Sequence, residues 1–132
     1  MAKDNDLGGE TSQTMDRGLA VIGLLAEPAH ATGLTVTEMA QKLGVGRPVI
    51  YRLVASLARR DIVIRRIDGR ICLGVGLIHL ANSVWPGLRD VASPILRELA
   101  ETSGLTAHLT VADRGEALAI AVVAVVGTAL VP

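Results

Sequence analysis

The stretch that decides the fold is TVTEMAQKLGVGRPVIYRLVASL, residues 35–57. Thr35 and Glu38 have the spacing of a capping box, in which each side chain accepts a hydrogen bond from a backbone N–H at the helix start. Behind the box, apolar residues recur at intervals of three and four, namely Val36, Met39, Ala40 and Leu43. This periodicity predicts a short amphipathic helix. Gly44 is then expected to end the helix in a left-handed conformation.

A second helix is predicted directly after this glycine turn. Pro48 stands at or near its first turn, where a missing N–H is harmless. The apolar residues of one side are Val49, Ile50, Leu53, Val54 and Leu57. The opposite side carries Arg47, Tyr51, Arg52, Ala55, Ser56 and Arg59. With the small Ala40 at the crossing and a miniature core of Met39, Leu43, Val45, Ile50 and Leu53, the two helices predict a helix-turn-helix.

A β-hairpin is predicted to follow the second helix. Two short β-type segments, residues 62–67 and 70–73, flank Asp68-Gly69, a dipeptide typical of tight hairpin turns. Three arginines surround the expected tip, namely Arg65, Arg66 and Arg70. A helix-turn-helix followed by such a hairpin predicts a winged helix.

The charge distribution also separates this region from the rest of the chain. The formal net charge of the 132 residues is zero. Residues 14–73 nevertheless contain nine basic and five acidic residues, a net charge of +4, and the remainder carries −4. A basic half joined to an acidic half is typical of chains in which one part faces nucleic acid.

These features together predict binding to double-stranded DNA. An α-helix fits the major groove, and a basic wing can meet phosphates or the adjacent minor groove. The candidate DNA-contacting residues are Arg47, Tyr51, Arg52, Ser56, Arg59, Arg65, Arg66 and Arg70. Arg47 is the best candidate for a base contact, because arginine pairs bidentately with guanine.

The flanking segments complete an α+β organisation. We expect a flexible arm at 1–13, a winged helix-turn-helix domain at 14–74, a linker helix within 75–87 and a further helix and hairpin within 88–132. The first helix is predicted over 16–26 with Asp16 as its N-cap. In the later helix, residues 88–102, the residues expected to face inward are Val91, Ile95, Leu96 and Leu99. The last hairpin is predicted over 106–112 and 117–126.

No pattern in the sequence predicts catalysis or a bound cofactor. Cys72 is the only cysteine, and the three histidines lack the regular spacing of metal ligands. We therefore expect no catalytic residue, no metal and no cofactor, and a protein that is not an enzyme. The N-terminus lacks the apolar core of a signal peptide, and no apolar run is long enough to span a membrane. A soluble, cytoplasmic protein is expected.

The segments LTVTEMAQKLG (34–44), VIYRLVASL (49–57) and GRICLG (69–74) resemble the IclR-type bacterial transcriptional regulators. ASPILRELA (92–100) and TAHL (106–109) resemble the start of that family's effector domain. The resemblance implies a homodimer or higher homo-oligomer that binds a palindromic operator as a repressor or activator. It also implies a small-molecule effector domain with an α/β fold.

The chain departs from this family in two places. It includes only the first helix and hairpin of the effector domain, so we expect a truncated domain without the effector pocket. Arg47-Pro48 also replaces a small hydroxyl pair at the start of the recognition helix, which is expected to change what the helix reads.

Two other functional classes are open from the sequence. A dimerisation or interference module would pair with full-length relatives without binding DNA itself. A small-molecule sensor would act without DNA, which the missing pocket argues against. The valine-rich tail at 117–131 is expected to pair with another chain or with the missing half of a longer protein.

Overall fold

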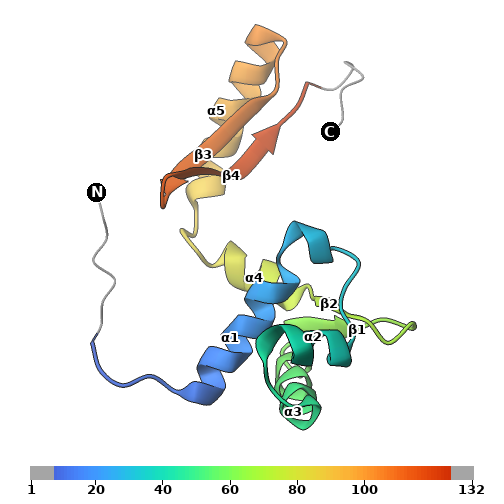
Figure 1. Cartoon of the computed structure of the whole chain (residues 1–132). Helices are drawn as coiled ribbons and strands as arrows, with labels where there is room; N and C mark the ends of the chain where they lie inside the picture. The colour runs from blue at the N-terminus through green and yellow to red at the C-terminus, as the bar shows by residue number, and fades with distance from the viewer. Residues whose placement is uncertain (1–7, 126–132) are drawn as a thin grey trace. The chain divides into compact units, whose positions relative to one another are not determined.

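The computed structural model describes residues 8–125 and divides into two compact units, one ending at Ala81 and the other beginning at Asn82 (Figure 1). The first unit contains α1 (Gln13–Leu25), the short 3-10 helix η1 (Pro28–His30), α2 (Val36–Leu43), α3 (Arg47–Ala58), β1 (Val63–Arg65), β2 (Ile71–Leu73) and most of α4 (Gly76–Asn82). The second contains α5 (Leu88–Ser103), β3 (Ala107–Asp113) and β4 (Glu116–Val123). A mixed α+β fold is confirmed.

The first helix begins earlier than the sequence predicted. Its N-cap is Ser12, whose hydroxyl accepts the Met15 N–H at 3.4 Å, and the predicted cap Asp16 lies within the first turn. The correction has a simple cause, since serine and aspartate are both good caps and a negative charge is also favourable one turn inside the helix. Of the predicted arm, Gln13 already belongs to α1, and residues 1–7 lie outside the described residues.

The core of the first unit joins α1, α2 and α3 to the hairpin. Its buried residues are Val21, Leu25, Leu34, Val36, Met39, Ala40, Ile50, Leu53, Ile62, Val63 and Ile71. Leu43 and Val45 pack against this core, so the predicted miniature core of the two-helix motif is confirmed. The capping box is confirmed as well, because the Thr35 and Glu38 side chains each accept the other's backbone N–H.

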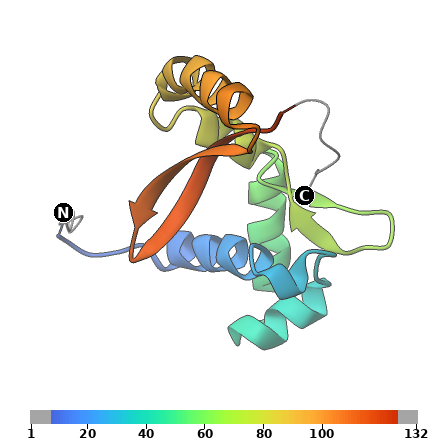
Figure 2. The ribbon, with the colours of Figure 1, turned by 90° about the horizontal axis from the view of Figure 1, so that it is seen from above.

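The wing is a short antiparallel hairpin in which Val63 pairs with Leu73 and Arg65 with Ile71. The sequence suggested a two-residue Asp68-Gly69 turn, whereas the loop has three residues, 67–69. Arg66 N–H donates to the Arg70 carbonyl at 2.8 Å, and Gly69 N–H donates to the Arg66 carbonyl at 3.0 Å. Gly69 has a φ of 83°, which gives the loop a turn followed by a left-handed residue. Figure 2 shows this loop projecting away from the helices.

The linker helix is shorter than the predicted span, since α4 covers only Gly76–Asn82. Its first residue, Gly76, packs against the turn after α3, where an added Cβ would lie 2.3 Å from the Arg60 carbonyl oxygen. Trp85, expected within this helix, instead has a φ of 51°, and α5 begins at Leu88.

In the second unit, α5 packs against one face of the β3–β4 hairpin. The buried residues are Ala92, Leu96, Ala100 and Ala107. Of the four residues predicted to face inward, only Leu96 does so, whereas Val91, Ile95 and Leu99 are exposed. Small side chains at this contact allow the helix backbone to approach the hairpin closely, so the larger residues of α5 lie on another side. The last three residues of the predicted 117–126 strand lie beyond β4, and residue 126 is outside the described residues.

Candidate nucleic-acid interface

The turn between α2 and α3 fixes the direction in which α3 faces. Gly44 ends α2 with a φ of 66° and a ψ of 31°, and its N–H donates to the Ala40 carbonyl. Arg47 begins α3 directly after the Gly46 N-cap. Because Ile50 is fully buried in the core that α2 also lines, the opposite face of α3 is held outward.

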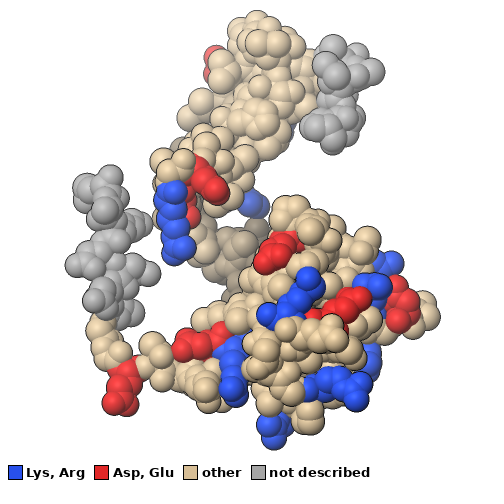
Figure 3. Space-filling view, in the orientation of Figure 1, with Lys and Arg blue, Asp and Glu red and all other residues tan. Residues whose placement is uncertain are grey.

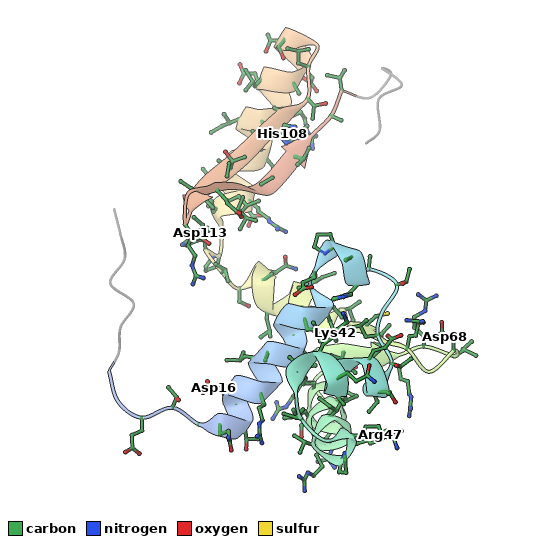
Figure 4. All side chains as sticks on the ribbon, in the orientation of Figure 1. Asp16, Lys42, Arg47, Asp68, His108 and Asp113 are labelled. Atoms are coloured by element: carbon green, nitrogen blue, oxygen red, sulfur yellow. The ribbon has the colours of Figure 1, made fainter. Side chains whose placement is uncertain are left out.

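That outward face carries the residues that the sequence predicted as groove contacts. Arg47, Tyr51, Arg52, Ser56 and Arg59 are all exposed. Figure 3 shows basic side chains along the lower end of the first unit, where Figure 1 places α3, and Figure 4 labels Arg47 there. Within residues 8–125 the ion pairs join His30 to Glu27 and Arg70 to Glu38. The α3 arginines are therefore not neutralised by a described carboxylate.

The three wing arginines do not share one environment. Arg65 and Arg66 are exposed, as a phosphate contact requires. Arg70 instead turns inward, with Nη1 at 3.1 Å from the Gly33 carbonyl oxygen and 3.4 Å from Glu38 Oε2. Its guanidinium already has partners inside the fold, which sets it apart from the other predicted contacts.

Ile67 lies at the wing tip and was not among the residues predicted from the sequence to contact DNA. The residue is fully exposed and sits between Arg66 and Asp68, the latter labelled at the tip in Figure 4. Isoleucine is one of the apolar side chains that minor-groove-binding proteins insert between base steps. In the sequence, an isoleucine between the charged residues Arg66 and Asp68, next to a predicted turn, could have indicated this position.

Other kinds of site find little support in the part of the chain that is described. Residues 8–125 bring no three of His, Cys, Asp and Glu together in an arrangement that would hold a metal ion. A surface groove along α5 is lined by Asp90, Ser93, Pro94, Arg97, Glu98 and Glu101, none of which is a predicted DNA contact. Over the same described range, no helix has the length and apolar character needed to cross a lipid bilayer.

Residues 14–66 match the family model of the IclR helix-turn-helix domain. The chain carries an IclR-type helix-turn-helix domain. The matched range includes α2, α3, β1 and all but the first residue of α1, and it holds seven of the eight predicted contacts. The resemblance seen in the sequence is thereby confirmed.

The similarity to known proteins extends beyond that domain. It is 32% identical over 112 residues to the HTH-type transcriptional regulator BhcR of Paracoccus denitrificans, covering 78% of this chain and 38% of BhcR. It is 30% identical over 112 residues to the acetate operon repressor of Salmonella typhimurium, covering 82% of this chain and 40% of the repressor. The chain thus spans about two fifths of the length of these curated relatives.

Solved structures of IclR-type proteins share the fold. A crystal structure of an IclR family transcriptional regulator from Brucella abortus matches with a TM-score of 0.65 and 26% identity, covering 87% of this chain and 45% of that one. The Thermotoga maritima IclR structure matches with a TM-score of 0.67 and 24% identity, covering 84% and 45%. The winged-helix architecture therefore agrees with experimental structures.

Proposed function

We propose that residues 14–74 form a domain that binds double-stranded DNA and that the chain regulates transcription, as a repressor or an activator. One observation carries the proposal: α3 buries Ile50 and Leu53 and presents an exposed face rich in arginine on the opposite side. The major groove is about as wide as a helix, and arginine binds both phosphates and guanine. The names of the relatives, which are transcriptional regulators and repressors, support the same function.

Within this proposal the exposed residues have different roles. Arg47 stands at the first position of α3, the end of a recognition helix from which base contacts are usually made. Tyr51, Arg52 and Ser56 lie further along the same face and contribute to sequence preference. Arg59 and the wing residues Arg65 and Arg66 are assigned to phosphates or the adjacent minor groove.

We further propose that the protein binds a palindromic operator as a homodimer, paired partly through the segment around α4. Val75, Ile78 and Leu80 are each about three-fifths exposed there, and such apolar surface is stabilised by contact with a second subunit. Sedimentation velocity compares the wild type with Ile78→Asp. We expect the wild type to sediment as a dimer and the variant to shift toward the monomer. An unshifted variant contradicts this mode of pairing.

DNA binding is tested by titrating the full chain against a short fluorescent duplex enriched from a random pool by the wild type. The logarithm of the affinity is expected to fall linearly with the logarithm of salt concentration, with a slope of about 0.9 per phosphate neutralised. Arg52→Ala is expected to weaken binding about tenfold or more. Arg97→Ala, which removes an exposed arginine of α5, is the matched control and leaves affinity nearly unchanged. A wild-type chain that binds no duplex at low salt contradicts the proposal.

A further inference from the structure

The base of the wing is tied to the start of α2 through a single carboxylate. Glu38 Oε2 accepts the Thr35 N–H at 3.0 Å and also lies 3.4 Å from Arg70 Nη1. Arg70 Nη1 is in addition 3.1 Å from the Gly33 carbonyl oxygen. The Glu38 oxygen that completes the capping box of α2 therefore also contacts Arg70, the residue before β2.

Backbone contacts reinforce the same junction. Leu34 and Ile71 form an antiparallel bridge next to the Arg70 contact. A Cβ added at Gly33 would lie 2.6 Å from Cys72 Sγ and 2.7 Å from the Ile71 carbonyl oxygen, so the loop before α2 lies directly against β2. A hairpin with three residues in each strand is only marginally stable by itself. We therefore expect these contacts to contribute strongly to its orientation.

We propose that Glu38 and Arg70 are positioning residues that hold the wing at a fixed orientation to α3. The proposal rests on the DNA-binding function proposed above. Because α2 packs on α3, fixing the wing to the first turn of α2 also fixes it to the recognition helix. The wing arginines and the α3 arginines can then contact the same duplex at once. Because the wing is already ordered in the free protein, binding does not incur the entropy cost of ordering it.

The variant Glu38→Gln separates this role from simple electrostatics. Glutamine keeps an acceptor for the Thr35 N–H, since both residues serve in a capping box, but it removes the charge that faces Arg70. Deleting a carboxylate from a DNA-binding surface strengthens binding when only long-range charge matters. Positioning predicts the opposite sign: Glu38→Gln weakens binding about five- to tenfold. Glu27→Gln, which removes an exposed carboxylate that faces His30 and not the wing, is the matched control.

A double-mutant cycle tests whether the effect passes through the wing. In a chain that already carries Arg65→Ala and Arg66→Ala, Glu38→Gln is expected to have almost no further effect on affinity, because the wing contacts are gone. Arg70→Lys, which keeps a cation facing Glu38, is expected to retain more affinity than Arg70→Gln. If Arg70 contacted phosphate itself, its loss would instead add to the loss of Arg65 and Arg66.

A readout without DNA separates failure of this proposal from failure of the proposed function. Hydrogen exchange is measured at the amides of Arg66 and Ile71, which donate to the Arg70 and Leu34 carbonyl oxygens. Glu38→Gln is expected to speed exchange there several-fold and to leave α1 and the thermal midpoint nearly unchanged. Unchanged wing exchange, or a variant that binds duplex as well as the wild type, overturns the positioning role alone. A wild type that binds no duplex overturns both proposals.

Discussion

Leu34 and Ile71 exchange backbone hydrogen bonds: Leu34 N–H donates to the Ile71 carbonyl at 3.0 Å, and Ile71 N–H donates to the Leu34 carbonyl at 2.7 Å. Both side chains are buried in the core of the first unit. The loop before α2 thus serves the wing as a minimal third strand. The stability of the wing depends on residues that lie far from it in the sequence.

Replacing Gly33 by alanine is expected to destabilise the first unit by about 2–4 kcal/mol, as seen in urea unfolding. Gly33 has a φ of 89°, where an L side chain is strained, and its Cβ would meet Cys72 and Ile71 at less than 3 Å. The control is Gly23→Ala, which lies inside α1 with nothing within 4 Å of the added carbon. That change is expected to stabilise by about 0.5–1 kcal/mol. Equal effects of the two variants would contradict the strain at Gly33.

Thr35→Ala is expected to lower the free energy of unfolding by about 1 kcal/mol. The change leaves the Glu38 N–H without its 3.1 Å partner while preserving the Glu38 acceptor for the Thr35 backbone. Thr37→Ala, an exposed position in the same turn, serves as control and is expected to change stability by less than about 0.5 kcal/mol. Thermal unfolding followed by circular dichroism compares them.

Met39→Ala is expected to cost about 2–5 kcal/mol, since Met39 is fully buried between the helices of the motif and its loss leaves a cavity. Leu19→Ala on the exposed side of α1 is expected to cost far less, because its side chain is more than half exposed. Chemical denaturation of both variants checks the difference. A similar cost at the two positions would mean that the core is not centred on α2.

In α5, Leu96→Ala is expected to destabilise the second unit by about 2–5 kcal/mol, whereas Ile95→Ala changes its stability by less than about 0.5 kcal/mol. Leu96 is 6% exposed and Ile95 63%, although they are neighbours in the sequence. Hydrogen exchange of the α5 amides reports on this unit separately. Greater loss of protection in Ile95→Ala would reverse the assignment of the buried face.

The sequence predicted the two-helix motif well because its signals are local. A capping box, a glycine turn and apolar spacing act within a few residues, so Thr35, Glu38 and Gly44 could be assigned correctly without knowledge of the rest of the fold. The exposed face of α3 follows from the same spacing, which is why Arg47 and Arg52 lie where they were expected to lie.

The remaining features depend on contacts between distant segments. The buried side of α5 is chosen by the alanines of a hairpin that follows it, so Val91 and Ile95 could not be placed from helical spacing alone. Arg70 lies in a basic hairpin, and the approach of Glu38 and of the Gly33 carbonyl oxygen distinguishes it from Arg65 and Arg66. Charge patterns alone do not tell which cation is already paired within the fold.

The close approach of Gly33 to Cys72 has a practical consequence. Cys72 is the only cysteine of the chain, half-buried in β2, and its sulfur lies against the loop that β2 contacts. A thiol reagent therefore labels a single atom, and its access depends on how often that contact opens. The rate at which Cys72 is modified in the native protein therefore measures how often the wing detaches from the loop. This measurement requires no DNA.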